Sequence, residues 1–229
     1  MQGDYLRRGT AEFIGAFALT FFGAGAIMVG SAGLFGVAVA HGLAIALMVT
    51  ALGHISGGHF NPAITLAFLA TRRIGASLAA VYWAMQLAGA SVAALLLWWI
   101  FPKEAIAPAR LGAPLLHTSI GQGAGFALEA IMTFFLVLAV FATAVDPRGA
   151  FKAIAGFGIG LVITMDVLAG GPLTGAAMNP SRAFGPEIVY RVWESYTWIY
   201  YAGPAVGALV AGLLYEYLYL RPKTVAATA

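Results

Sequence analysis

Two short motifs combine residue types that can present hydrogen-bond donors at the start of a helix. They read Asn61-Pro62-Ala63 and Asn179-Pro180-Ser181. Asn is a favoured N-cap residue and Pro is a favoured first helical residue. Each motif is therefore predicted to begin a helix and to point the positive end of the helix dipole at the segment before it. The chemistry on offer is the binding of a neutral polar molecule by amide groups and helix ends.

A glycine-rich stretch precedes each motif, from Ile55 to Phe60 and from Gly170 to Met178. Irregular backbone is tolerated at membrane depth only where it lines a wet cavity or is buried in protein. Its carbonyl oxygens would then form a row of acceptors for water. The candidate carbonyls are those of Gly57, Gly58, His59, Gly175, Ala177 and Met178.

Three carboxylates lie inside apolar segments, at Glu12, Glu129 and Asp166. A carboxylate at membrane depth is costly, which makes each one a functional candidate. Glu12 and Glu129 could form a proton relay, or they could accept hydrogen bonds from the glycine-rich backbone and hold it in place. Asp166 has no evident partner and is interpreted as a structural residue.

The other reactive residue types do not form a pattern typical of an enzyme or a metal site. Cysteine is absent, which excludes disulfides, thiolate chemistry and cysteine metal ligands. His54 and His59 are five residues apart in an irregular stretch, unlike a metal-binding pair on a helix. No convergent set of acid, base and nucleophile is evident. We expect no enzyme activity, no metal and no cofactor.

The elements that position these residues must lie in lipid. Of the 229 residues, 61% are hydrophobic and 9% are charged, with a mean hydropathy of +0.89. A soluble domain carries about 25% charged residues. The formal net charge of +3 gives no support to nucleic-acid binding.

Six apolar segments are long enough to span a bilayer, which takes about 20 residues. They are roughly Ala11–Gly30, Leu34–Leu52, Leu78–Phe101, Gly123–Val145, Ala153–Leu168 and Tyr196–Leu218. Two further apolar pieces follow the motifs and end near Ala70 and Val189. Each is about half a span, which favours re-entrant segments.

The placement of positive charge predicts the orientation. Six spans put both ends of the chain on one side, and that side carries 8 of the 12 Lys and Arg residues. These are Arg7, Arg8, Arg72, Arg73, Arg148, Lys152, Arg221 and Lys223. The positive-inside rule therefore predicts cytoplasmic termini.

The chain also repeats itself. Glu129 follows Glu12 by 117 residues, and Asn179 follows Asn61 by 118. Each half holds three spans, and an odd number of spans inverts the second copy. The predicted organisation is one channel domain over 1–229, with repeat one at about 9–101 and repeat two at about 121–220. Inverted repeats with broken helices are typical of transport proteins with a site at the midplane.

These motifs resemble the aquaporin (major intrinsic protein) family over essentially the whole length. The resemblance rests on Ala11-Glu12-Phe13, on the run from His54 to Ala63, and on the run from Met178 to Pro186. One departure is Ser181, where the family usually has Ala, and we expect little effect. The resemblance implies an all-α membrane fold in which two half-helices meet at the centre. It also implies that Asn61 and Asn179 donate to a single file of water and that the family's barrier opposes cations and protons.

The resemblance further implies a homotetramer with one pore per subunit, and a structural role for Glu12 and Glu129. It places a selectivity ring at His41, Val167, Ala176 and Arg182. Arg182 is always charged, donates to neutral solutes and repels cations. The ring is similar to that of plant vacuolar (tonoplast) intrinsic proteins, some of which pass urea, hydrogen peroxide or ammonia. His117 is interpreted as a solvated loop residue.

The sequence leaves two rivals to a water channel. A glycerol facilitator would carry Asp after the ring Arg and a basic residue four positions further on, where this chain has Ala183 and Glu187. Tyr200-Tyr201 resembles the water branch. A secondary transporter would need acids at the midplane for a coupling ion, whereas the midplane groups here are amides.

The compartment is a separate expectation. The absence of Cys, the short termini and the lack of an obvious sorting signal favour a cell (inner) membrane. A vacuolar membrane is the alternative that the ring suggests.

Overall fold

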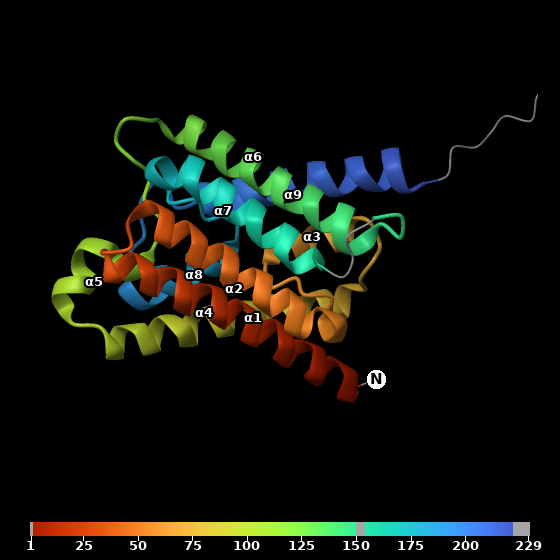
Figure 1. The fold of residues 1–229 in the computed structure, drawn as a ribbon, viewed down its shortest axis with the longest axis horizontal. Helices are drawn as coiled ribbons and strands as arrows, with labels where there is room; N and C mark the ends of the chain where they lie inside the picture. The colour runs from red at the N-terminus through yellow and green to blue at the C-terminus, as the bar shows by residue number, and fades with distance from the viewer. Residues whose placement is uncertain (1, 150–153, 222–229) are drawn as a thin grey trace, which may run out of the picture.

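The computed structural model describes residues 2–149 and 154–221. Within these residues every regular element is helical, and Figure 1 shows the long helices running side by side along the molecule. Lys152, Ala153 and Lys223, which entered the sequence predictions, lie outside the described residues.

Within the described ranges, six helices are long and apolar enough to cross a membrane. They are α1 (Gln2–Val29), α2 (Gly33–Ser56), α4 (Ala76–Ile100), α6 (Gln122–Val140), α7 (Ala155–Thr174) and α9 (Ile199–Leu214). The π-helical segments η2 (Phe141–Val145) and η4 (Tyr215–Leu220) extend α6 and α9. Two short helices, α3 (Pro62–Ala70) and α8 (Pro180–Tyr190), follow the two motifs. The predicted fold of six spans and two half-length helices is confirmed.

The predicted ends of two spans were wrong. α2 continues to Ser56 and α7 to Thr174, so both take up part of the glycine-rich stretches. Each ends where the next residue, Gly57 or Gly175, adopts a left-handed conformation with φ of 97° or 81°. Glycine is the usual residue at such a helix end because it has no Cβ to clash. The irregular backbone before each motif is therefore confined to residues 57–60 and 175–178.

Smaller differences occur at three other places. α1 begins at Gln2, well before Ala11, and α9 begins at Ile199, after Tyr196. A short helix α5 (Lys103–Ala109) and a 3-10 turn η1 (Arg110–Gly112) form in the connection between α4 and α6, where no element was predicted.

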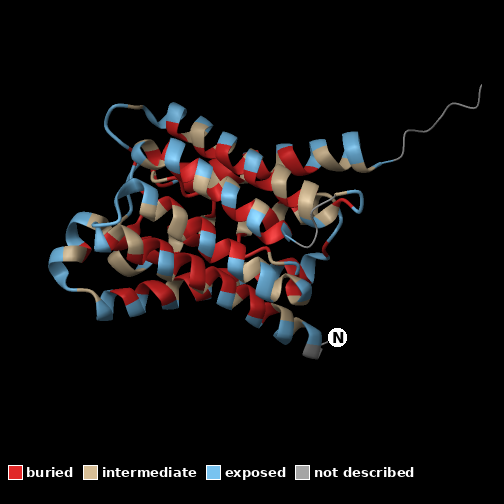
Figure 2. Cartoon of the chain, viewed as in Figure 1, coloured by how far each residue is buried: buried red, intermediate tan, exposed pale blue. Residues whose placement is uncertain are grey.

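The two halves of the chain pack their helices in the same way. α1 lies against α4, and α6 lies against α9 in the same way, while α2 and α7 join the two halves. Each short helix packs on the other half, because α3 contacts α9 and α8 contacts α4. Figure 2 shows buried positions along the inner sides of the helices and exposed positions on their outer sides.

Charged side chains tie the helix ends together. On one face, Arg73 Nε donates to Glu216 Oε2 over 2.7 Å and joins the end of α3 to η4. On the same face, Arg148 Nη2 donates to the carbonyl of Tyr219 over 2.7 Å. Hydrogen bonds from Arg148 also hold the pKa of Asp146 well below its ordinary value. The bonds from Arg73 and Arg148 thus fasten two connections to η4, at the end of the final span.

Close helix contacts depend on two glycines that are 118 residues apart. A Cβ at Gly89 would lie 2.3 Å from the carbonyl oxygen of Phe13, where α4 crosses α1. A Cβ at Gly207 would lie 2.1 Å from the carbonyl oxygen of Ala130, where α9 crosses α6. Small residues let helices in membranes approach closely. At these two crossings only glycine fits the observed separation.

Replacing Gly207 by Ala should therefore destabilise the fold, because the added methyl group meets backbone that cannot rotate away. Overpacking of this kind costs about 1–3 kcal/mol. The measurement is the thermal unfolding midpoint of the purified protein in detergent. Gly123→Ala is the matched control, since a Cβ there meets nothing within 4 Å. Equal midpoints for the two variants would contradict the close packing of α6 and α9.

Candidate functional site

The side chains of both motif asparagines cap the short helices. Asn61 Oδ1 accepts from the Ala63 amide at 2.8 Å. Asn179 Oδ1 accepts from the Ser181 amide at 3.0 Å and from the Arg182 amide at 3.3 Å. The Ser181 hydroxyl also donates to Asn179 Oδ1 at 2.8 Å, a bond that alanine could not make. Ser181 thus gives this chain an additional restraint on Asn179.

The same two side chains also link the two halves of the molecule. Asn61 Nδ2 donates to the Met178 carbonyl, and Asn179 Nδ2 donates to the Phe60 carbonyl, each over 2.9 Å. A primary amide carries two N–H groups. Each asparagine therefore keeps one N–H that these cross-links do not use. Both asparagines line the same central cavity, described below.

Glu12 holds the backbone before the first motif. Its Oε1 accepts from the Ser56 hydroxyl at 2.6 Å and from the His59 amide at 3.0 Å. Its Oε2 accepts from the Phe60 amide at 2.6 Å and from Gln86 Nε2 at 2.8 Å. Four donors thus surround a carboxylate that is fully buried. Charged acceptors make the stronger class of hydrogen bond, so this backbone is firmly held.

Glu129 makes the equivalent contacts in the second half. Its Oε1 accepts from the Thr174 hydroxyl at 2.7 Å and from the Ala177 amide at 2.9 Å. Its Oε2 accepts from the Met178 amide at 2.8 Å. The bonds stabilise unusual backbone, because Phe60 and Met178 have φ of 49° and 51°. Positive φ is uncommon for residues with bulky side chains.

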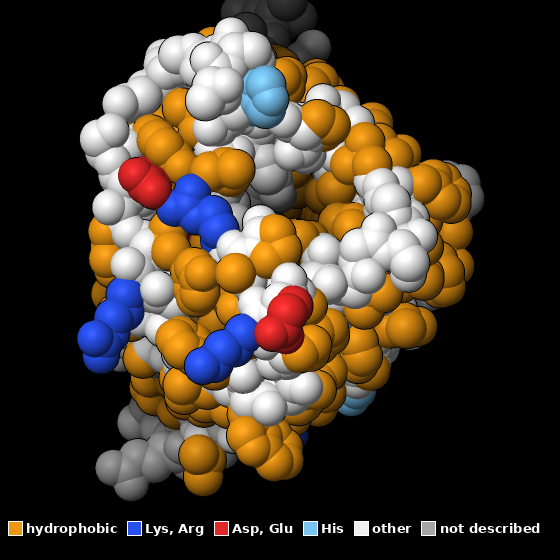
Figure 3. Space-filling view, turned by 90° about the vertical axis from the view of Figure 1, so that its left-hand side faces the viewer, with side chains coloured by type: hydrophobic (Ala, Val, Ile, Leu, Met, Phe, Trp, Pro, Cys, Tyr) orange, Lys and Arg blue, Asp and Glu red, His pale blue; other side chains and the backbone are white. Residues whose placement is uncertain are grey.

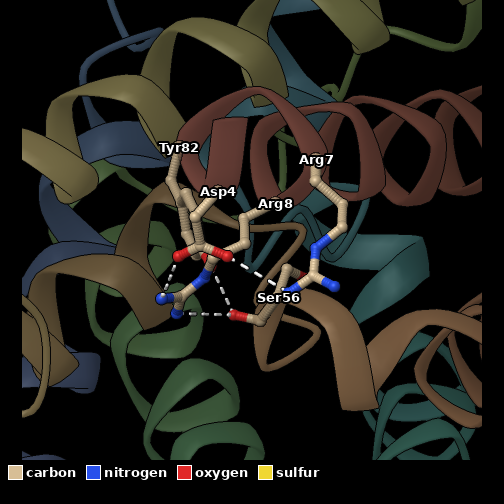
Figure 4. A network of polar contacts seen from close by, with 5 residues as sticks. All are labelled: Asp4, Arg7, Arg8, Ser56 and Tyr82. Carbon is tan, nitrogen blue, oxygen red and sulfur yellow. Dashed lines mark hydrogen bonds and ion pairs between the residues drawn. The ribbon is translucent and has the colours of Figure 1, made fainter. Parts of the chain in front are cut away.

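A further network of polar contacts reaches this backbone from the N-terminal end of α1 (Figure 4). Arg8 Nε donates to the Tyr82 hydroxyl at 2.9 Å, and the Tyr82 hydroxyl donates to the Ser56 carbonyl. Asp4 lies 3.6 Å from the Arg8 guanidinium. Tyr82 and Gln86 could not be identified from the sequence, because a polar group on an apolar helix does not reveal its partner. Tyr200, 118 residues after Tyr82, is buried and its hydroxyl has no partner among the described residues.

Three hollows follow one another along the length of α2. Val37 and His41 line an outer vestibule, His41 and Ile45 line a central cavity, and Val49 and Gly53 line an inner vestibule. Successive positions in this series are four residues apart, so each lies one turn along the helix from the one before it. The volume open to water is about 270 Å³ in the outer vestibule, 20 Å³ in the central cavity and 370 Å³ in the inner vestibule. The central cavity therefore has the least free space of the three.

Figure 3 shows the face that carries α5, with a recess in it and charged side chains to one side of the recess. Arg110, which lines the outer vestibule, pairs with Glu194 at 2.5 Å.

The structure brings the four predicted ring residues to the boundary between the outer vestibule and the central cavity. His41 and Arg182 line both hollows, Val167 lines the vestibule, and Ala176 lines the cavity. All four are buried. Nη1 of Arg182 is buried and makes no hydrogen bond to any described residue, so it has a donor to spare for a molecule in the passage.

The six residues with candidate carbonyls are distributed along the passage. Gly57 lines the inner vestibule and Gly175 the outer one. The central cavity is lined by Gly58, His59, Ala177 and Met178. The carbonyl of Met178 already accepts from Asn61, and a carbonyl oxygen has a second lone pair for another donor.

The remaining candidates fall outside the narrow part. His117 is exposed, contacts Ser119 and lines the outer vestibule. Asp166 is buried, and one of its carboxylate oxygens has no partner among the described residues. The described residues contain no cluster of three metal-ligating side chains. The apolar wall of the central cavity was not predicted residue by residue, because apolar spans give no signal for which side faces a pore. Its members are Leu19, Ile45, Ile64, Leu136, Ile159 and Ile163.

Comparison with known proteins gives consistent matches. The family model described as "Major intrinsic protein" matches residues 2–215. A Zea mays protein named "Aquaporin TIP4-4" is 43% identical over 223 residues, which cover 92% of this chain and 85% of that protein. An Oryza sativa subsp. japonica protein named "Probable aquaporin TIP3-2" is 48% identical over 186 residues, covering 81% of this chain and 68% of that protein.

Among solved structures, the X-ray structure of the aquaglyceroporin from Plasmodium falciparum superposes with a TM-score of 0.84. It is 25% identical, and the superposition covers 93% of this chain and 96% of that one.

The contacts of Glu12 give a test of how this backbone is held. Glu12→Gln keeps the shape of the side chain but replaces one carboxylate oxygen with an NH₂ group. In either orientation that NH₂ faces a donor, so at least one buried bond to a charged group is lost. We expect a loss of about 1–3 kcal/mol, measured as a lower denaturation midpoint in detergent.

The matched control is Glu104→Gln, at an exposed position in α5. A midpoint for Glu12→Gln as high as that of the control would show that the carboxylate does not hold the backbone.

Proposed function

Since the chain belongs to the major intrinsic protein family, we propose that it is a passive channel for water that excludes ions and protons. The observation that carries this proposal is the small central cavity, which lies between two larger vestibules along α2 and is lined by both motif asparagines. Its free volume of about 20 Å³ is close to what a single water molecule requires, about 10–15 Å³. A central cavity of this size admits water molecules one at a time. We call it the waist of the passage.

The charges around the waist support exclusion of cations. Arg182 is the charged side chain that lines the central cavity, and no carboxylate lines it among the described residues. The helices α3 and α8 both begin at asparagines of this cavity, so two positive helix ends face it. The spare N–H groups of Asn61 and Asn179 would fix the orientation of a water between them. Water held as an acceptor from both sides cannot relay a proton.

We propose His41, Val167, Ala176 and Arg182 as the selectivity ring, with small neutral solutes such as urea, hydrogen peroxide or ammonia as additional permeants. A glycerol facilitator is the alternative within the family, favoured by the name of the matched Plasmodium falciparum structure. Against it, Glu187 is buried and accepts from the Tyr201 hydroxyl at 2.6 Å, where a glycerol channel would carry a basic residue.

An ion-coupled transporter is the alternative from another class. It would need midplane acids that are free to bind an ion. Both oxygens of Glu12 and of Glu129 already accept hydrogen bonds from surrounding donors. Asp166 has an oxygen with no partner among the described residues, but it lines none of the three hollows. The carboxylates of Glu12 and Glu129 are better suited to supporting the backbone. A proton relay through them would also defeat the barrier at the waist. Members of the family are channels, and an enzyme activity has no support in the site.

Assembly and orientation complete the proposal. One domain contains two inverted repeats, at about 9–101 and 121–220, and four subunits assemble, each with its own pore.

Both termini face the cytoplasm, in line with the arginines near the start of α1 and near the C-terminal ends of α3 and η4. The chain is a multi-pass membrane protein. The TIP names of its relatives favour the vacuolar membrane over the cell (inner) membrane that the sequence predicts.

Stopped-flow light scattering on proteoliposomes tests the proposed function. A sucrose gradient should produce shrinkage much faster than in empty liposomes, because the waist admits water. Urea and glycerol gradients measure the larger solutes under the same conditions. Glycerol flux comparable to water flux would reject the water-channel proposal in favour of the glycerol facilitator.

A His41→Phe variant tests the ring. The bulkier, apolar ring should abolish passage of solutes larger than water and preserve most of the water flux. The measurement is the urea-to-water permeability ratio of variant and wild-type proteoliposomes with equal protein content. An unchanged ratio would show that His41 does not limit the passage.

A further inference from the structure

One face of α1 meets the passage at three levels. Leu19 lines the central cavity and Ile27 lines the outer vestibule. Gly23 lies midway between them, one turn from each, on the same side of the helix. The boundary between the two hollows is therefore at the level where α1 has no side chain.

The imidazole of His41 occupies the space that a side chain at position 23 would fill. A Cβ built on Gly23 would lie 2.4 Å from His41 Nε2, 2.6 Å from Cδ2 and 2.8 Å from Cε1. All three separations are shorter than real Cβ contacts. The ring also contacts its own helix, where Nδ1 is 2.8 Å from the carbonyl oxygen of Val37. His41 is thus held between its own helix and the bare backbone of α1.

We propose that Gly23 is a positioning residue for selectivity: it provides the recess that keeps the His41 ring back from the passage. The inference rests on the proposed function, because it concerns the width of the same constriction. A methyl group at position 23 requires the ring to move. Since His41 lines both the vestibule and the cavity, movement away from α1 carries the ring into the passage. The constriction would become narrower although His41, Val167, Ala176 and Arg182 all stay unchanged.

Gly23 differs in this respect from the packing glycines at the helix crossings. At Gly89 and Gly207 the nearest atoms are backbone, so a substitution there strains the fold itself. At Gly23 the three nearest atoms all belong to one side chain, which can turn. Gly25, on the same helix, provides the control, because a Cβ there meets only Leu97 Cδ2 at the ordinary distance of 3.6 Å.

The test compares Gly23→Ala and Gly25→Ala in proteoliposomes. Gly23→Ala should lower urea flux several-fold and water flux less, so that the urea-to-water ratio falls. Gly25→Ala should leave the ratio at its wild-type value. In a His41→Ala background, where no ring remains to be displaced, Gly23→Ala should have no effect on the ratio. An unchanged ratio in the single variant, or an equal fall in the His41→Ala background, would overturn the proposal.

A second readout does not depend on transport. In protein labelled at its histidine rings, the NMR signal of His41, assigned from its loss in His41→Ala, should shift in Gly23→Ala and stay in place in Gly25→Ala. If the wild-type protein conducted no water, the function proposed above would fail while this signal still tested the position of the ring. A His41 signal unchanged by Gly23→Ala would reject the positioning role of Gly23 even if water flux were normal.

Discussion

The structure depends on how two short pieces of irregular backbone are kept at the centre of a helical bundle. Their amide groups cannot bond within a helix, and unpaired amides are costly in a membrane interior. Glu12 and Glu129 supply acceptors from neighbouring spans, and the asparagines at positions 61 and 179 bind the carbonyls of the opposite half. The carboxylates of Glu12 and Glu129 are therefore each balanced by two backbone N–H groups. These buried polar side chains hold the backbone that lines the passage in its conformation.

The two halves share a plan but differ in their outer supports. In the first half, the Tyr82 hydroxyl is bonded on both sides, by Arg8 and by the Ser56 carbonyl. In the second half, the Tyr200 hydroxyl has no partner among the described residues. Ser181 adds a bond to its asparagine, whereas Ala63 in the first half cannot. The additional hydrogen bond therefore supports the end of α2, at Ser56, in the first half. In the second half it supports the motif asparagine, Asn179.

The sequence was sufficient for the features that local chemistry or repetition determines. The N-caps at Asn61 and Asn179, the short helices and the six spans all follow from residue type and spacing. The ends of α2 and α7 were misplaced, because a glycine-rich stretch does not reveal which glycine takes up the left-handed conformation. Tyr82, Gln86 and Gly23 were not predicted at all. Their roles arise only when helices from distant parts of the chain come together, which no single-helix pattern records.

The reciprocal bonds between the two asparagines and the opposite carbonyls also bear on how the protein is made. When synthesis has completed only the first three spans, the side-chain amide of Asn61 and the carbonyl of Phe60 have no counterpart, because Met178 and Asn179 do not yet exist. The centre of the membrane must hold these polar groups unmatched, or keep them near water, until the second half is inserted. The bonds that join the two halves at the centre of the passage can therefore form only after the second motif has been synthesised.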